Sequence, residues 1–254
     1  MTKGIYLKLL HFRPLRVPLR WCRAKAQELC GYSDPFYDMC RVARAAKASL
    51  FIDIGCHTGE TLLRFVESGM DCPIAAFDPM PESLERARQL LIGRQNISFY
   101  QAAISDSDGK AEFHCNKNEQ TSSLLLNDVG NTFSFPEDTT SEKTIQVDTI
   151  RLDSWAKAHS PNSFALIKCD TQGAEGKVVR GGIDFIRKHI AAFYCEVMIG
   201  NMYQGQTSFE ELSALLEKEC GMVLQNIYPC LHDAQGRAVQ FDAMWVKPQF
   251  LLKR

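Results

Sequence analysis

The sequence lacks a long hydrophobic run, an internal repeat and any low-complexity tract. Its longest N-terminal apolar stretch, residues 5–12, is interrupted by Lys8 and His11, so we expect neither a signal-peptide core nor a membrane-spanning helix. It also lacks an excess of one charge, because 29 Lys and Arg residues face 30 Asp and Glu residues. This balance excludes a generic polyanion-binding protein. We therefore expect a globular protein of the cytoplasm that does not bind nucleic acid.

Metal-binding patterns are absent as well. The ten cysteines form no Cys-x-x-Cys pair and the six histidines show no metal-ligand spacing, so we expect no metal site. Cys56, Cys169 and Cys195 lie in or beside apolar runs, which is typical of free, buried thiols in a reducing compartment.

The balanced net charge conceals a basic N-terminal arm. Residues 1–30 contain seven Lys and Arg residues and the single acidic residue Glu28, a net charge of +6, which leaves −7 on the other 224 residues. The arm favours contact with an anionic surface such as membrane headgroups, which would make the protein peripheral to a membrane, and a solvated terminus is an equally good interpretation. We divide the chain into this arm with a short helical appendage (residues 1–48) and one domain (residues 49–254).

Short apolar runs recur along the domain, each bounded by Gly, Pro or Asp. Such runs are typical of strands buried on both faces of a parallel sheet, and the helical patterns between them predict crossover units. The expected strands cover residues 49–54, 74–77, 97–104, 164–169 and 191–197, and the expected helices cover residues 35–47, 60–68, 81–91, 174–180 and 209–219. Ser208 is the expected N-cap of the last helix.

The C-terminal part departs from this alternation. Residues 223–228 and 242–247 flank a polar turn that leaves no room for a helix, so we expect these last two strands to pair antiparallel. The polar segment 116–143 has no steady period and is a candidate lid. Phe133, Phe135 and Tyr203 lie in loop-like stretches, where loop packing and substrate stacking are both open interpretations.

The strongest local motif joins the first expected strand to its helix. It holds Asp53, Gly55 and Gly59 in the pattern Asp-x-Gly-x-x-x-Gly, whereas a dinucleotide fingerprint would need Gly-x-Gly-x-x-Gly. Glycines permit a sharp turn and the close approach of a ligand, although the same turn could exist without one. Asp78 ends the next strand, where a carboxylate can accept hydrogen bonds from both hydroxyls of a ribose or can cap the helix begun at Pro81. The two motifs together predict an adenosine ligand.

A wider resemblance rests on four stretches: IDIGCHTGET from Ile52, FDPMPES from Phe77, AISDSDGKAEF from Ala103 and LIKCDTQGAEGKVVRGG from Leu166. On these motifs the chain resembles the FkbM-type family of class I S-adenosylmethionine-dependent methyltransferases, over roughly residues 50–247. The resemblance implies an α/β fold, a doubly wound, seven-stranded, mostly parallel sheet with a reversed last strand. It also implies S-adenosylmethionine as cofactor and methyl transfer to a hydroxyl oxygen of a sugar, glycan or secondary metabolite.

The resemblance further assigns a cofactor site. The expected cofactor-binding residues are Asp53, Gly55, His57, Thr58, Gly59, Asp78, Ala103 and Asp106. The glycine turn would surround the methionine part, Asp78 would hold the ribose, and residues 102–106 would lie along the adenine. His57 departs from the pattern, because methyltransferases often have glycine there and this family often has asparagine. Its side chain is expected to face the cofactor or the adjacent helix rather than to act as a base.

The candidate catalytic residues are Asp170, Glu196 and Lys168. Lys168 and Asp170 are two apart on an expected strand and share one face, so a buried Lys168 would pair with Asp170 and with Asp53 on the neighbouring strand. Asp170 stands at the carboxyl end of its strand, where ligands bind in open α/β sheets, although the pair could instead order the sheet edge. Glu196 could contact substrate or cap a loop, and Glu175 could simply favour a helix dipole. An alcohol acceptor would need a base such as Asp170 or Glu196.

Two rival functions share this fold. A nicotinamide-dependent reductase is disfavoured by the missing Gly-x-Gly-x-x-Gly, whereas a non-catalytic binding or scaffold protein is compatible with the motifs. The sequence predicts neither the identity of the acceptor nor the oligomeric state.

Overall fold

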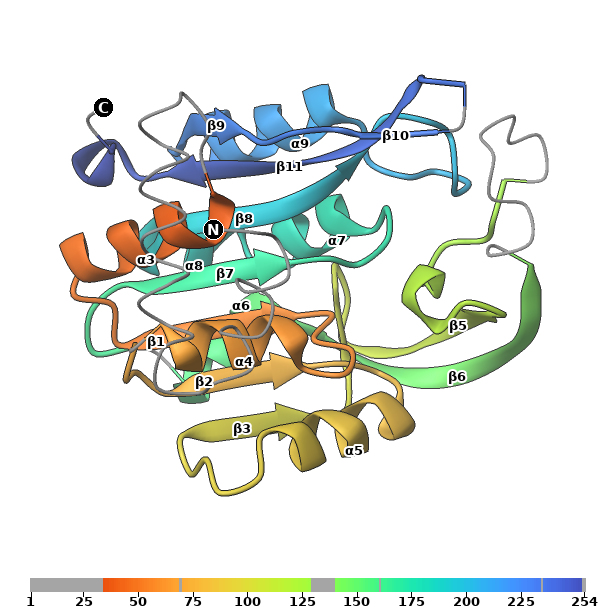
Figure 1. Ribbon diagram of the computed structural model, residues 1–254, viewed down its shortest axis with the longest axis horizontal. Helices are drawn as coiled ribbons and strands as arrows, with labels where there is room; N and C mark the ends of the chain where they lie inside the picture. The colour runs from red at the N-terminus through yellow and green to blue at the C-terminus, as the bar shows by residue number, and fades with distance from the viewer. Residues whose placement is uncertain (1–33, 69, 129–139, 160, 234, 253–254) are drawn as a thin grey trace, which may run out of the picture.

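A computed structural model describes residues 34–68, 70–128, 140–159, 161–233 and 235–252 (Figure 1). Within these residues the protein has an eight-stranded main sheet and a separate three-stranded sheet. The basic arm and the expectations for Phe133 and Phe135 lie outside the described residues.

The main sheet has the order β10-β11-β8-β7-β1-β2-β3. Its parallel strands are β1 (Leu50–Ile54), β2 (Ile74–Phe77), β3 (Ile97–Tyr100), β7 (Ala165–Cys169) and β8 (Ile190–Met198). The last strand, β11 (Ala238–Val246), runs antiparallel to β8, and β9 (Val223–Ile227) and β10 (Leu231–His232) both pair antiparallel with β11. The α/β class, the parallel core and the reversed last strand are as expected. The described sheet has eight strands rather than seven because the two residues of β10 also pair with β11.

The expected single strand over residues 97–104 is wrong. The chain leaves the main sheet after β3 and forms β4 (Ala103–Ser105), which pairs with β6 (Ser141–Arg151). A long hairpin of β5 (Gly109–Asn116) and β6 completes the second sheet. The run of residues 97–104 carries no local mark of such a bend, because its two halves differ in which strand they pair with, β2 for the first and the distant β6 for the second.

Helices cover both faces of the main sheet (Figure 1). One face carries α3 (Pro35–Ala45), α4 (Glu60–Glu67) and α5 (Pro81–Leu90). The other face carries α6 (Leu152–His159), α7 (Glu175–Arg180), α8 (Ile183–His189) and α9 (Phe209–Ala214), which continues as a π-helical stretch, Leu215–Glu219. The fold is therefore doubly wound, as expected.

Helix α3 packs into the core although the sequence assigned it to the appendage of residues 1–48. Met39 and Val42 are fully buried with Phe51 of β1 in one apolar cluster. Helices α6 and α8 had no counterpart among the expected helices.

Alternation along the central strands determines where polar groups emerge. Phe51 and Ile52 of β1 belong to the cores on opposite faces, and Asp53 follows on the same face as Phe51. Asp53 and Lys168 are register partners on β1 and β7. Charged side chains thus collect at the carboxyl edge of the sheet.

Candidate active site

A cavity of about 440 Å³ opens at the carboxyl edge of the main sheet. Its walls come from the ends of β1, β2, β7 and β8, from β4, and from the 3-10 helix Glu119–Thr121 that follows β5. This position and volume are typical of ligand sites in open α/β folds.

The turn after β1 forms one wall of the cavity. Gly55 has a φ of +76°, and a Cβ there would lie 1.9 Å from the backbone oxygen of Asp170. The turn therefore requires glycine because β1 and β7 end in close contact. His57 has a φ of +45°, so the residue that replaces a family asparagine still adopts a left-handed conformation.

Asp78 is held at the end of β2 by two backbone donors. Its Oδ2 accepts from the His57 N–H at 2.9 Å and its Oδ1 accepts from the Met80 N–H at 2.9 Å. Burial raises the pKa of Asp78, while these two bonds act in the opposite direction. Each carboxylate oxygen retains a lone pair for a ligand hydroxyl. Asp78 thus orders the chain entering α5 and also lines the cavity.

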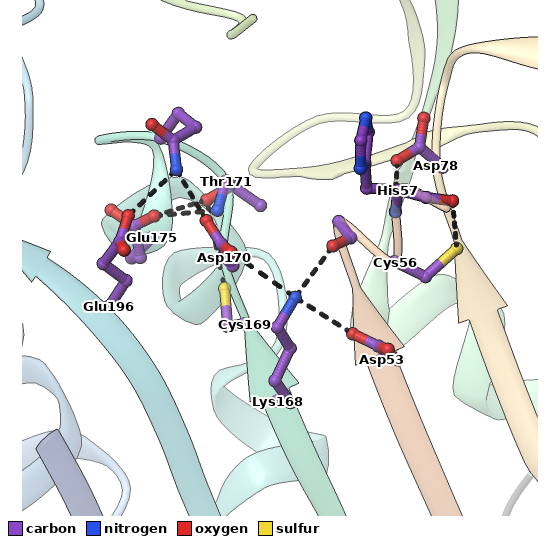
Figure 2. Close-up of polar contacts among 12 residues, drawn as sticks. Asp53, Cys56, His57, Asp78, Lys168, Cys169, Asp170, Thr171, Glu175 and Glu196 are labelled. Carbon is purple, nitrogen blue, oxygen red and sulfur yellow. Dashed lines mark hydrogen bonds and ion pairs between the residues drawn. The ribbon is translucent and has the colours of Figure 1, made fainter. Parts of the chain in front are cut away.

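Lys168 lies beneath the turn and joins three acceptors (Figure 2). Its Nζ donates to the Gly55 carbonyl at 2.8 Å and lies 3.2 Å from Asp53 Oδ1 and 3.6 Å from Asp170 Oδ2. The expected ion pairs of Lys168 are therefore present. Burial raises the pKa of Asp53 to about 6 against the opposing charge of Lys168. Burial acts to lower the pKa of Lys168, but Asp53 and Asp170 outweigh it and raise that pKa, so Lys168 is a fixed cation.

Asp170 and Glu196 are brought together by one amide. Gln172 Nε2 donates to Asp170 Oδ1 at 2.7 Å and to Glu196 Oε2 at 2.9 Å. Tyr203 donates its hydroxyl to Gln172 Oε1 at 3.1 Å, and Gln240 Nε2 donates to Glu196 Oε1. Burial and the charge of Asp170 raise the pKa of Glu196 well above its ordinary value.

Glu175 organises the loop between β7 and α7. Its Oε1 accepts from the Thr171 N–H at 2.9 Å, the Thr171 hydroxyl at 3.0 Å and the Gly173 N–H at 3.3 Å. Burial raises the pKa of Glu175 to about 7. Its position supports a structural function in this loop.

The predicted site residues divide between the cavity and its surroundings. Those that line the cavity are Gly55, His57, Thr58, Asp78, Ala103, Lys168, Asp170 and Glu196. The other three predicted residues, all in the described part of the chain, lie outside its lining. Asp53 is buried beneath the turn, Gly59 is the N-cap of α4 against Ala87, and Asp106 lies 3.5 Å from Lys177.

Three residues that line the cavity, Gln172, Gln240 and Glu119, were not predicted as site residues from the sequence. Gln172 stands inside a quoted motif, but nothing local signals its bridging amide. Gln240 reaches Glu196 only because β11 pairs with β8, and Glu119 reaches the cavity only through the second sheet. Tyr203 is 1% exposed, and Gln172 Oε1 and the Thr121 carbonyl, 2.8 Å away, share its single hydroxyl proton, which supports the loop-packing interpretation for Tyr203.

Family comparison gives this geometry its context. Residues 53–224, more than half of the chain, match the methyltransferase FkbM domain. The chain belongs to this family. It is 28% identical over 174 residues to 2-O-methyltransferase NoeI of Sinorhizobium fredii (strain NBRC 101917 / NGR234), which covers 66% of this chain and 70% of that protein.

Solved structures of methyltransferases also resemble the chain. N-methyltransferase NodS from Bradyrhizobium japonicum WM9 has a TM-score of 0.44 and 14% identity, covering 84% of this chain and 94% of that chain. A precorrin-6y C5,15-methyltransferase from Geobacter metallireducens GS-15 has a TM-score of 0.44 and 10% identity, covering 84% of this chain and 87% of that chain.

This FkbM-family protein is a methyltransferase whose cofactor is S-adenosylmethionine. The cavity fits that cofactor on two observations. Asp78 offers two carboxylate oxygens, and the buried Nε2 of His57 has no hydrogen-bond partner. Among the described residues, no cluster of three or more His, Cys, Asp or Glu could hold a metal ion. None of the described helices has the length and hydropathy needed to span a bilayer.

Proposed function

We propose that this protein is an O-methyltransferase acting on a hydroxyl of a sugar, glycan or secondary metabolite. The observation that carries the proposal is the pair of carboxylates, Asp170 and Glu196, which meet at one amide beside the cofactor strands. An alcohol is a poor nucleophile unless its proton is removed, and a carboxylate within reach can accept that proton. The name of the relative NoeI, a 2-O-methyltransferase, supports the same chemistry.

The cofactor half of the cavity is assigned to the ends of β1, β2 and β4. Asp78 would hold the ribose hydroxyls, and the turn through Gly55, His57 and Thr58 would surround the methionine part. Ala103 of β4 would lie along the adenine. The bound cofactor supplies an electrophilic methyl group, and transfer depends above all on aligning the acceptor oxygen with it.

The acceptor half is assigned to Asp170, Glu196 and Lys168. Asp170 is the general base in this proposal, because it lines the cavity at the carboxyl end of β7 and its side chain is 34% exposed. Glu196 accepts from a second acceptor hydroxyl and orients it. Lys168 keeps Asp170 in place and does not need to touch the acceptor.

The decisive experiment replaces Asp170 by Asn. Asp170→Asn preserves the shape and removes the charge, so turnover should fall by about 10² to 10⁴. Affinity for S-adenosylhomocysteine, measured by calorimetry, should change far less. Turnover is measured as label transferred from methyl-labelled cofactor to a cell extract, and the products are identified by mass spectrometry. Asp184→Asn, at an exposed position of α8, is the matched control.

Two results would overturn this assignment. Loss of S-adenosylhomocysteine binding in the folded Asp170→Asn variant would make Asp170 part of the cofactor site, and Glu196→Gln would then test Glu196 as the base. Abolition of activity by a chelator, with recovery on adding magnesium, would make Asp170 a metal ligand instead.

A further inference from the structure

The charged groups that line the cavity are mostly acidic. Among the described residues, the acidic lining residues are Glu60, Asp78, Glu119, Asp170 and Glu196. Against them stand Lys168 and, when protonated, His57. The kind of acceptor that can enter therefore depends on whether any positive or hydrogen-bond-donating group is still free at the acceptor end.

Lys168 is already held by protein acceptors. Its ammonium group donates to the Gly55 carbonyl at 2.8 Å and forms ion pairs with Asp53 at 3.2 Å and Asp170 at 3.6 Å. Its side chain is only 9% exposed. A phosphate or carboxylate on the acceptor would have to displace one of these protein acceptors.

Two of the backbone donors after β7 are occupied as well. N–H groups of a loop that leads into a helix commonly bind anions. Here the N–H groups of Thr171 and Gly173 already donate to the carboxylate of Glu175, at 2.9 and 3.3 Å. The protein therefore places its own carboxyl group where a ligand anion would bind.

The loop after β8 is closed to anions in the same way. The N–H groups of Met202 and Tyr203 donate to Gln206 Oε1 at 2.8 and 3.0 Å. Gln172 donates both of its amide protons, to Asp170 and Glu196, and Gln240 donates one of its two to Glu196. Among the described residues, this end therefore offers mainly acceptor oxygens, on Asp170 and Glu196.

We infer that the part of the acceptor that enters between Asp170 and Glu196 is an uncharged polyol, with neighbouring hydroxyls that donate to the two carboxylates and no phosphate, sulfate or carboxylate among them. A hydroxyl can donate to the carboxyl oxygens of Asp170 and Glu196, whereas an anion would meet a cavity whose charged lining residues are mostly acidic. The inference rests on the proposed O-methyl transfer and names the chemical class of its acceptor.

Tandem mass spectrometry of the labelled extract product tests the inference. The expected product carries its new methyl group on an oxygen of a unit with a free neighbouring hydroxyl and no anionic substituent. A methyl group on an oxygen of a phosphorylated, sulfated or carboxylated unit overturns this inference and leaves the O-methyltransferase proposal intact. A methyl group on nitrogen or carbon overturns both.

A matched pair of acceptors gives a quantitative test. The acceptor identified from the extract is compared with its derivative sulfated on the hydroxyl next to the methylated one. We expect kcat/KM to fall at least a hundredfold for the sulfated compound and at most about tenfold for a derivative that carries a neutral methyl ether at the same oxygen. Equal losses for the two derivatives would show that size rather than charge is rejected, and would overturn the inference.

Discussion

At the scale of single residues, Asp78 both orders the backbone around it and lines the cavity. Its carboxylate accepts from His57 and Met80 and still faces the cavity, whereas Asp106 faces Lys177 outside the lining. From the sequence, we expected both Asp78 and Asp106 to bind the cofactor. Their different surroundings now predict different consequences of removing them.

Asp78→Ala should weaken S-adenosylmethionine binding at least tenfold. Each charge-assisted bond to a ribose hydroxyl contributes about 1.5 to 3 kcal/mol, so the loss of two bonds exceeds that factor. Asp106→Ala should leave the affinity within about twofold. Isothermal calorimetry on both variants measures the effect, after circular dichroism has shown that each is folded. Equal affinity of the Asp78 variant and the wild type would contradict the ribose assignment.

Gln172 is a second residue whose importance is visible only in three dimensions. Its amide donates to Asp170 and Glu196, and its hydrogen bond acts to lower the pKa of Glu196 against burial and the charge of Asp170. The residue also has a φ of +54°, an uncommon conformation for a side chain other than glycine or asparagine. We therefore interpret Gln172 as a positioning residue.

Gln172→Met should shift the acidic limb of the pH profile of kcat upward by about one unit. Loss of the amide removes a donor that stabilises the ionised carboxylates, and one unit corresponds to about 1.4 kcal/mol. KM for the cofactor should remain within about twofold. Gln89→Met, on the exposed face of α5, is the matched control. A lower kcat at every pH with an unshifted profile would instead indicate a purely structural role.

At the scale of secondary-structure elements, the β7–α7 connection depends on a buried acid. Glu175 accepts three hydrogen bonds in this loop, and burial raises its pKa to about 7 from an ordinary 4.5. Between about pH 4.5 and pH 7, the carboxyl group of Glu175 therefore stays protonated in the folded state, whereas in the unfolded chain it is ionised. The stabilisation from Glu175 is complete below pH 4.5 and is lost as the pH rises toward 7.

Glu175→Gln should remove this dependence on pH. The free energy of unfolding of the wild type, relative to that of the variant, should fall by up to about 3 kcal/mol between pH 4 and pH 8. Urea unfolding of both proteins at several pH values measures the difference. Glu210→Gln, in the exposed first turn of α9, should leave the pH dependence as in the wild type. A relative stability of the Glu175 variant that does not change with pH would contradict the argument.

The elements that the sequence predicted well share one property, which is that their signals are local. Strand β2 has the expected bounds, and Ser208 caps α9 by accepting from the Glu211 N–H at 3.1 Å. The second sheet was missed because β4 and β6 are distant in sequence and pair through contacts that no local pattern specifies. Helix α8 was missed because the run before β8 is short and follows Gly181–Gly182 directly.

The same distinction holds for the candidate site. Lys168, Asp170 and Asp53 were expected together because strand alternation and parallel register place them side by side. Gln240 and Glu119 could not be expected, since each depends on which distant strand or helix closes the cavity. Asp106 lies outside the lining of the cavity, 3.5 Å from Lys177, so its assignment to the cofactor stays a prediction.

At the scale of the whole molecule, the two apolar cores position the site rather than form it. Alternate residues of β1 pack against the helices on both faces of the sheet. Strand β7 pairs with β1 along its whole length, so this packing fixes the ends of both strands. The close contact between Gly55 and Asp170 then joins the cofactor half of the cavity to the acceptor half. A ligand bound to this edge should consequently stabilise the entire fold.

Cofactor binding should therefore raise the melting temperature of the protein. A ligand that binds only the folded state, at 100 times its Kd, adds about 2.7 kcal/mol, which for a chain of this size corresponds to roughly 5 to 10 °C. The shift should be smaller for Asp78→Ala at the same cofactor concentration and unchanged for Asp106→Ala. Reduced nicotinamide dinucleotide at that concentration should give no shift, because the turn after β1 has His57 and Glu60 at the positions where a Gly-x-Gly-x-x-Gly motif starting at Gly55 needs its second and third glycines. Differential scanning calorimetry measures all four cases. A nicotinamide shift as large as that with S-adenosylmethionine would mean that the cavity recognises adenosine in general, and that the methionine part contributes little to binding.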